Sequence, residues 1–514
     1  MGANLVAETE CAAGGKAQTL VEQVEWYVLA RLAQQRSASF AGSVPLVIVD
    51  AFANWSVVAL REVFDRLDRM ADVIQIVYLT EADDVALWAE ALGPDKARLI
   101  DTRGSPETTP TGAGGATVRL GTHGVPAYQL ASAVRLHDHR LLEDRSARDG
   151  RDIVDLGFGN PDLASPPVAV DKLIEAARNS RNHRYSSSRG LPKLREAVAG
   201  YYRRRFGVEL DPDREVINTI GAKEGFSHLM WALVGPGDAA LVPSPSYPIH
   251  IYGPLLAGAE VREIPMIGGA EPFFDALVDG WRYNQPKPRV IVLSFPHNPT
   301  TACVDPAFFQ RVVDFAREND VVIVHDNAYA DLGFDGYQPP SILQADGAKE
   351  CAVELYSMTK SFSMAGWRVA FMLGNADIVA ALAKLKSYLD YGTFQPIQIA
   401  ATVAINEAPT FPAEQNAIYQ ARRDSLCEGL NRIGWEITPP QGTMFAWAPI
   451  PEPYREMGSI EFAKLLVTDA QVAVSPGVGF GPDGDGFVRF ALIENEQRIG
   501  QAVRNLRRSL TKLG

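Results

Sequence analysis

Lys360 and Arg368 are the residues of this 514-residue chain whose types and spacing most clearly suggest chemistry. They stand in the segment from Ser357 to Phe371, S-M-T-K-S-F-S-M-A-G-W-R-V-A-F, among small and hydroxyl side chains. A lysine amine attacks a carbonyl only when it is unprotonated, and an arginine held nearby suits a phosphate. The pair therefore indicates a phosphorylated aldehyde bound to the lysine as a Schiff base, which is the chemistry of pyridoxal 5'-phosphate (PLP). Taken alone, the segment fits a surface lysine in a loop equally well, and class A β-lactamases also use S-x-x-K.

Polar residues follow two apolar segments that we expect to be buried strands. Asp326 ends the segment V-V-I-V-H-D, and a carboxylate beside a pyridine nitrogen would keep that nitrogen protonated. Tyr329 stands three residues later, and Asn298 follows R-V-I-V-L-S-F in the turn P-H-N-P-T. Both side chains could reach a phenolic oxygen of the same ring. Individually, Asp326 also fits a helix N-cap and Asn298 a plain turn.

Three further segments suggest binding groups. Gly221-Ala222-Lys223 follows a strand-like segment and would open a helix, whose backbone N–H groups form an anion site, although a plain turn is commoner. Tyr247, in P-S-P-S-Y-P, could stack on a flat ring, although aromatic residues in turns are more often structural. Arg489 stands mid-strand between apolar neighbours, where it could bind a substrate carboxylate in bidentate fashion or form an internal salt bridge.

The strands that must position these residues alternate with helices from about residue 150 onward. Strand-like segments are R-E-V-I-N-T-I-G, A-A-L-V-P-S-P, R-V-I-V-L-S-F-P and V-V-I-V-H-D, and each runs into a turn. Ligands of open α/β sheets bind at the carboxyl ends of the strands. We therefore expect the candidate residues to meet at one edge of a sheet.

The first 150 residues predict a separate, smaller α/β unit. An amphipathic helix over 16–36 precedes strands that begin near Pro45, at V-I-Q-I-V-Y-L-T and at A-R-L-I-D-T, with helices between them. This alternation is typical of a βαβαβ unit, and no G-x-G-x-x-G or Walker loop follows any strand. Residues 103–116 resemble a linker. We place the main domain boundary near residue 150, so that residues 1–145 form an extension of unknown role.

The composition is that of a globular protein, with 46% hydrophobic and 22% charged residues. A formal net charge of −13 argues against nucleic acid as a partner. The four cysteines have no C-x-x-C spacing, so we expect reduced thiols and no metal site. We find no signal peptide, myristoylation motif or run of 18 apolar residues, and therefore expect a cytoplasmic protein that is not bound to a membrane.

The order and spacing of these segments resemble the class I/II aminotransferases of PLP fold type I. The resemblance covers about residues 150–514. R-G-L-P at 189–192, P-S-P-S-Y-P-I-H-I-Y-G, M-A-G-W-R, D-Y-G-T-F, and V-S-P-G-V-G-F-G with V-R-F-A-L-I-E-N are most similar to bacterial alanine (glutamate–pyruvate) aminotransferases. The implied α/β fold is a large domain with a mostly parallel seven-stranded sheet and a small C-terminal α/β domain. The resemblance implies an arm and small-domain segment over 150–200, the large PLP-binding domain over 201–410 and the small C-terminal domain over 411–514.

The resemblance also implies a homodimer, amino acid and oxo acid substrates, and a role for each candidate residue. Lys360 would form the Schiff base and move the proton, Asp326 would hold the ring nitrogen, and Asn298 with Tyr329 would bind the ring oxygen. The phosphate would be bound by Ser357, Arg368, Ala222 and Lys223, and Tyr247 would stack on the ring. Tyr185 would contact the phosphate in the other subunit. The substrate carboxylate would be bound by Arg489, Asn298 and the backbone near Gly159.

Several positions depart from the family pattern and leave the reaction open. Ala222 replaces a usual serine, Arg184 a usual glycine, and Asn327 follows the aspartate where an apolar residue is common. Ser361-Phe362-Ser363 follows the lysine in place of a tyrosine-asparagine pair. Besides transamination, the same cofactor could support β- or γ-elimination or replacement on a larger substrate such as S-adenosylmethionine. A regulator with a fused DNA-binding module is disfavoured, because residues 1–100 are acidic overall and do not resemble a helix-turn-helix.

Overall fold

The computed structural model describes residues 46–49, 76–79, 152–266 and 268–510. The chain divides into two compact units, Met1–Thr117 and Val118–Gly514, and each is described by itself. In the first unit, strand β1 (Leu46–Val49) pairs in parallel with β2 (Ile76–Leu79). Two of the strands expected there are therefore confirmed, and their parallel pairing fits a βαβ connection. The expected helices, the third strand and the linker at 103–116 lie outside the described residues.

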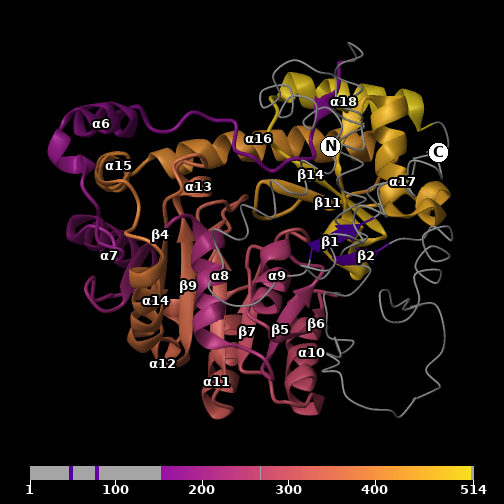
Figure 1. Cartoon of the computed structure of the whole chain (residues 1–514). Helices are drawn as coiled ribbons and strands as arrows, with labels where there is room; N and C mark the ends of the chain where they lie inside the picture. Colours follow the sequence, from indigo (N-terminus) through magenta and orange to yellow (C-terminus); the bar gives the residue numbers. More distant parts are fainter. Residues whose placement is uncertain (1–45, 50–75, 80–151, 267, 511–514) are drawn as a thin grey trace, which may run out of the picture. The chain divides into compact units, whose positions relative to one another are not determined.

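The second unit contains a seven-stranded sheet with the order β4-β10-β9-β8-β7-β5-β6 (Figure 1). The pairs from β9 to β6 are all parallel, whereas β10 runs antiparallel to both of its neighbours. The expected fold, a mostly parallel seven-stranded sheet, is confirmed. The strands are β4 (Val216–Thr219), β5 (Ala239–Ser244), β6 (Glu260–Pro265), β7 (Val290–Leu293), β8 (Val322–Asn327), β9 (Ala352–Ser357) and β10 (Ala370–Gly374).

Six of the seven strands are buried on both faces, which is why they are largely apolar segments rather than alternating ones. The edge strand β6, E-V-R-E-I-P, is only partly buried. Ile217, Val242 and Val292 pack against helices on one face, whereas Leu241 and Ile291 pack on the other. The first face is covered by α8 (Ala222–Leu233), α9 (Pro248–Leu256) and α14 (Ala376–Leu389). The second is covered by α7 (Pro192–Phe206), α10 (Ala270–Tyr283), α11 (Pro306–Glu318) and α12 (Ala348–Cys351). Helix α15 (Gln395–Glu407) packs against α7.

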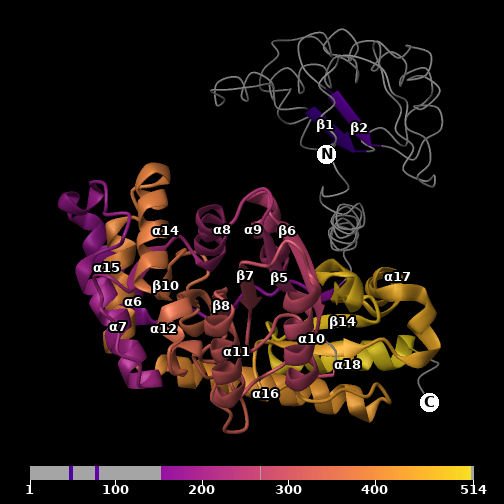
Figure 2. The ribbon, with the colours of Figure 1, turned by 90° about the horizontal axis from the view of Figure 1, so that it is seen from below.

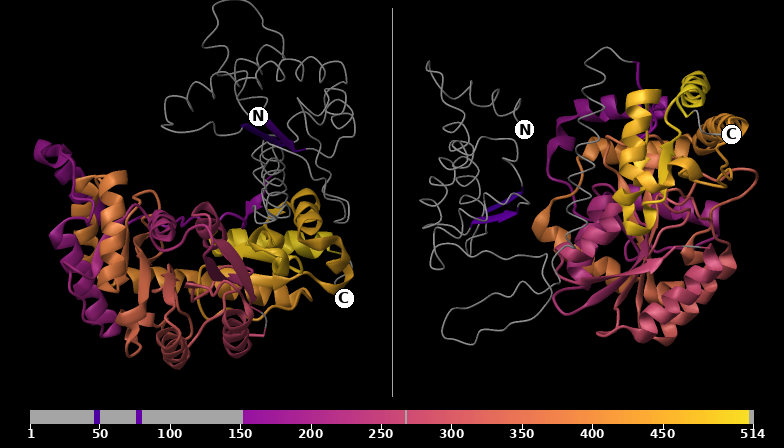
Figure 3. Two further views of the ribbon diagram at one scale, coloured as in Figure 1. Left: turned by 60° about the horizontal axis from the view of Figure 1, so that its bottom comes forward. Right: turned by 90° about the vertical axis from the view of Figure 1, so that its right-hand side faces the viewer.

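The polypeptide before the large sheet contributes to two places in the fold. Helix α15 packs against both α6 (Pro167–Arg178) and α7 at one end of the second unit (Figure 2). The same grouping of magenta and orange helices is visible in Figure 3. Strand β3 (Val154–Asp155) pairs in parallel with β12 (Val472–Ala473), so the first described strand of the second unit is joined to the C-terminal region.

The C-terminal region has its own hydrophobic core around a three-stranded sheet with the order β11-β14-β13. Its strands are β11 (Phe445–Pro449), β13 (Ser475–Pro476) and β14 (Phe487–Ala491), and its helices are α16 (Phe411–Arg432), α17 (Gly458–Leu465) and α18 (Glu496–Ser509). Two cores fit the expected large and small domains, while the boundaries at residues 200 and 410 stay a prediction. Among the described residues, Cys303, Cys351 and Cys427 are unpaired thiols, and no helix is both long and apolar enough to cross a bilayer.

Candidate active site

Lys360 lies just beyond the carboxyl end of β9, in the one-turn helix α13 (Met358–Ser361). Ser357 caps this turn by accepting a hydrogen bond from the Thr359 N–H at 3.3 Å. The Lys360 amine donates to the Gly159 carbonyl at 2.8 Å. Loss of hydration, followed by the positive charges of Arg489 and Arg368, lowers the pKa of Lys360 to about 7. A substantial share of this amine is therefore neutral near pH 7, as a nucleophile or a proton acceptor requires.

Gln415 holds the lysine segment in place. From α16, its amide donates to the Lys360 carbonyl oxygen at 2.5 Å and accepts from the Ser363 hydroxyl at 2.8 Å. Gln415 and Ser363 are both buried. The sequence analysis did not identify Gln415, because it stands 55 residues from Lys360 in an ordinary helical segment.

Asp326 lies at the end of β8, in a buried chain of three polar side chains. Its Oδ2 is 3.0 Å from Nε2 of His250, and Nδ1 of His250 is 3.0 Å from the Ser246 hydroxyl. Oδ1 of Asp326 is buried and has no hydrogen-bond partner among the described residues. A buried carboxylate with one free oxygen suits a cationic N–H donor. His250 and Ser246 were also not identified from the sequence.

Asn298 joins the two other polar groups at this edge of the sheet. Its amide nitrogen donates to the Tyr329 hydroxyl at 3.2 Å, and its carbonyl oxygen accepts from Nη1 of Arg489 at 2.7 Å. All three side chains are buried. Burial raises the pKa of Tyr329 far above its ordinary value, so its hydroxyl stays protonated and can donate to a neighbouring oxygen.

Arg489 is a buried guanidinium without a carboxylate partner among the described residues. Besides Asn298, it donates only to the Gly157 carbonyl and the Ser475 hydroxyl, both at 3.3 Å, and its Nε has no partner there. The guanidinium lies 4.0 Å from the ring centre of Phe445, and burial lowers its pKa to about 10. Within the described residues, Arg489 therefore forms none of the internal salt bridges that the sequence allowed. An unpaired buried cation suits an incoming anion, such as a carboxylate.

Gly221, Ala222 and Lys223 form the start of α8, directly after β4. Gly221 has a φ of 81°, and Ala222 and Lys223 are the first two helical residues, whose N–H groups have no acceptor within the helix. The Arg368 guanidinium lies against Gly221, because a Cβ at residue 221 would stand 2.2 Å from its Nη2. A helix N-terminus and an arginine therefore face the same space, as an anion site requires.

Tyr247 and Tyr185 lie in different surroundings. Tyr247 begins α9, and its ring centre is 5.2 Å from the Lys223 amine and 5.8 Å from the His250 ring. Tyr185 is 83% exposed, and its ring contacts Tyr391 at 4.7 Å. Stacking by Tyr247 and an action of Tyr185 in another subunit stay predictions.

Gly159 is tightly enclosed beside Lys360. A Cβ at residue 159 would lie 2.6 Å from the Phe445 ring and 3.8 Å from Nη2 of Arg489. Only a glycine fits without a shift of the aromatic ring, and its carbonyl is free to accept from Lys360.

Four features of the site are suited to binding a ligand. They are a lysine of low pKa, a carboxylate with one buried oxygen that has no partner among the described residues, a guanidinium without a carboxylate there, and a helix start beside an arginine. These features fit PLP together with an amino acid. The lysine would meet the aldehyde of PLP, the carboxylate its ring nitrogen, and the helix start with the arginine its phosphate. The buried guanidinium would meet the carboxylate of the amino acid.

The chain is similar in sequence and structure to known aminotransferases. Residues 151–506 match the family profile described as aminotransferase class I and II. The chain is 50% identical to the glutamate-pyruvate aminotransferase AlaC of Escherichia coli (strain K12) over 366 residues. This alignment covers 71% of this chain and 89% of that protein. It is 42% identical over 391 residues to the LL-diaminopimelate aminotransferase of Moorella thermoacetica, covering 76% of this chain and 97% of the relative. A solved structure of a probable N-succinyldiaminopimelate aminotransferase from Thermus thermophilus superimposes with a TM-score of 0.68 and 32% identity, over 73% of this chain and all of that one.

Proposed function

Because the chain belongs to the class I and II aminotransferases, we propose that it transfers an amino group between an alanine- or glutamate-like amino acid and a 2-oxo acid, with PLP bound at Lys360. The observation that carries this proposal is Arg489, a buried guanidinium that is linked through Asn298 to Tyr329 and has no carboxylate partner among the described residues. An amino acid bound there would complete the ion pair and bring its amine toward Lys360.

The cofactor supplies an aldehyde that captures the amine and a protonated ring that accepts the electrons released when the α-proton leaves. The free oxygen of Asp326 would hold the proton of the ring nitrogen, while His250 fixes the carboxylate from its other side. Lys360 would take the α-proton and return it one carbon away, a role that suits an amine with a pKa of about 7. Asn298 and Tyr329 would donate to the ring oxygen.

The remaining side chains would hold the cofactor in place. We assign the phosphate to Arg368, Ser357 and the N–H groups of Ala222 and Lys223, and ring stacking to Tyr247. Ala222 lacks the hydroxyl of the usual serine but keeps its backbone donor. Gly159 lies beside the lysine, where the Phe445 ring leaves no room for a side chain on residue 159.

Alanine and glutamate are the proposed substrates because half of the aligned residues are identical to those of AlaC. Elimination or replacement on S-adenosylmethionine is not favoured, since each relative named above is an aminotransferase. The chain is only 42% identical to the LL-diaminopimelate aminotransferase, so LL-diaminopimelate is a weaker candidate for the substrate.

We further propose that the active unit is a homodimer. Aromatic side chains near the predicted dimer-facing site are exposed: Tyr185, Tyr388, Tyr391 and Phe394 have exposed fractions of 83%, 80%, 61% and 45%. Tyr185 and Tyr391 already contact each other, so this apolar group could pack against a second copy. Light scattering on the purified protein should give twice the chain mass, and a monomer with full activity would contradict the proposal.

A steady-state assay tests the reaction itself. The purified protein with PLP, alanine and 2-oxoglutarate should release pyruvate and glutamate in equal amounts. A parallel sample with S-adenosylmethionine should release no thioether. No oxo acid product from alanine, glutamate or diaminopimelate, together with thioether release, would contradict the proposed function.

A further inference from the structure

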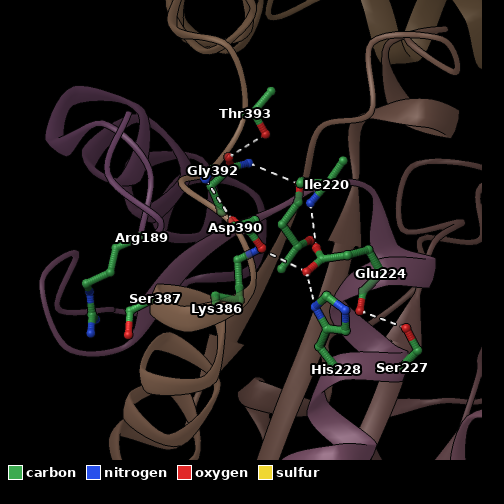
Figure 4. A network of polar contacts seen from close by, with 12 residues as sticks. Arg189, Ile220, Glu224, Ser227, His228, Lys386, Ser387, Asp390, Gly392 and Thr393 are labelled. Atoms are coloured by element: carbon green, nitrogen blue, oxygen red, sulfur yellow. Dashed lines mark hydrogen bonds and ion pairs between the residues drawn. The ribbon is translucent and has the colours of Figure 1, made fainter. Parts of the chain in front are cut away.

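Four charged or titratable side chains form a cluster, here called the Lys386 cluster, beside the start of α8: Glu224, His228, Lys386 and Asp390 (Figure 4). The Lys386 side chain is completely buried. Its amine lies 2.8 Å from Oε1 of Glu224 and 2.9 Å from Oδ2 of Asp390. Nδ1 of His228 is 2.6 Å from the same Glu224 oxygen. The proposed catalytic mechanism uses none of these four residues.

Glu224 is the third residue of α8 and therefore lies in the first turn of the helix. Its Oε2 accepts a hydrogen bond from the Ile220 N–H at 2.7 Å, so the carboxylate caps the turn that contains Gly221 and Ala222. This carboxylate therefore stands beside the backbone donors that we assign to the phosphate. An acidic side chain stabilises a helix N-terminus, but its charge also repels a second anion there.

The positive charge of Lys386 lies where it can offset the repulsion between Glu224 and a bound anion. Its ammonium contacts the Glu224 oxygen that does not bond Ile220, so the carboxylate can cap the turn while its charge is compensated. Asp390 holds the ammonium from the other side, and Oδ1 of Asp390 accepts from the Gly392 N–H at 2.7 Å. Thr393, one residue further, donates to Asn218 in β4, the strand that leads into α8. The oxygens of Glu224 and Asp390 also resemble metal ligands, but the Lys386 amine already supplies a cation between them.

We propose that Lys386 is a positioning residue of the phosphate site, which neutralises and orients Glu224 so that the first turn of α8 can accept a phosphate dianion. This inference rests on the proposed function, because it assumes that the cofactor phosphate binds at that turn. It assigns Lys386 no contact with the cofactor.

Binding to the cofactor-free full-length protein tests the inference without measuring activity. Isothermal titration with pyridoxamine 5'-phosphate and with pyridoxamine separates the phosphate contribution from binding of the ring. Lys386→Met keeps an unbranched side chain, one atom shorter than lysine, and removes the positive charge beside Glu224. We expect it to weaken pyridoxamine 5'-phosphate binding about ten-fold or more, because a unit charge several Å from a dianion changes the affinity by at least that factor. Pyridoxamine affinity should change less than about two-fold.

Two further variants make the test specific. In Glu224→Gln/Lys386→Met both charges are absent, while the introduced amide oxygen can still accept from the Ile220 N–H, so most of the phosphate affinity should return. Lys384→Met, which removes an exposed lysine from the same helix, is the matched control and should bind like the unchanged protein. Equal losses for both ligands, no loss, or no recovery in the double variant would overturn the inference.

The remaining outcomes are also decisive. If Lys386→Met does not fold, Glu224→Gln alone should bind pyridoxamine 5'-phosphate at least as tightly as the unchanged protein, and weaker binding would overturn the inference. Failure of the unchanged protein to bind pyridoxamine 5'-phosphate would contradict the proposed function itself. Normal binding by that protein with no effect of Lys386→Met would contradict only the role of Lys386.

Discussion

Arg489 provides a test in which activity and stability are expected to respond in opposite directions. Burial lowers its pKa from 12.5 to about 10, which corresponds to a cost of about 3 kcal/mol for keeping the charged form in the folded, ligand-free protein at pH 7. No carboxylate among the described residues offsets this cost, and the charge-assisted hydrogen bond to Asn298 returns about 1.5 to 3 kcal/mol. The ligand-free protein thus holds an unfavourable charge that a substrate carboxylate would stabilise.

The substitution Arg489→Met should therefore damage catalysis without damaging the fold. Two charge-assisted hydrogen bonds to the substrate would be lost, each contributing about 1.5 to 3 kcal/mol, so kcat/KM for alanine should fall by at least about 100-fold. Urea unfolding of the cofactor-free protein should show unchanged stability or a gain of up to about 1.5 kcal/mol, the difference between the burial cost and the returned hydrogen bond. Arg489→Lys keeps the charge but not the planar fork, and should recover only part of the activity.

The opposite result would refute this reasoning. If Arg489 were part of a buried ion pair, Arg489→Met would destabilise the protein by about 3 to 5 kcal/mol. Such a loss, or an unchanged KM and kcat for alanine, would show that the guanidinium serves the fold rather than the substrate.

Three other substitutions test the remaining groups of the site. The pKa of Lys360 is about 7 in the folded protein and 10.5 ordinarily, so the unfolded chain binds more protons between these values, and the stability of the cofactor-free protein should rise with pH across that window. Lys360→Met should reduce this rise in urea unfolding at pH 7 and pH 9, and an unchanged slope would contradict the assigned pKa. Gly159→Ala should raise the KM for alanine, because its Cβ would stand 2.6 Å from the Phe445 ring, and wild-type kinetics would show that this glycine is not needed. Asp326→Asn should lower kcat about 100- to 10,000-fold while the cofactor still binds, whereas an unchanged kcat would exclude the assigned ring-nitrogen contact.

The residues at strand ends could be predicted because the strands that precede them are short, apolar and bounded by turns. Asp326, Asn298 and Lys360 each follow such a segment, and parallel strands bring their carboxyl ends to the same edge. Arg489 was recognisable as a charged residue within an apolar strand. The number of strands and the roles of these residues came from the family resemblance rather than from periodicity.

The supporting contacts could not be read from the sequence. His250 lies 76 residues from Asp326, and Gln415 lies 55 residues from Lys360, so neither pair has a local pattern. Lys386 stands on α14 two residues from the exposed Lys384, and only the packing of α14 against α8 shows that one lysine is buried. Long-range pairing of this kind depends on tertiary structure, which residue spacing along one helix does not specify.

Peptide mapping after borohydride reduction, with and without alanine, tests the central claim most directly. Without alanine, reduction should fix the cofactor covalently to the peptide that contains Lys360. After excess alanine and no oxo acid, that adduct should disappear and about one pyruvate should form per site. An adduct on a different lysine, or an adduct on Lys360 that persists without pyruvate when alanine, glutamate and diaminopimelate are each supplied in excess, would contradict the account.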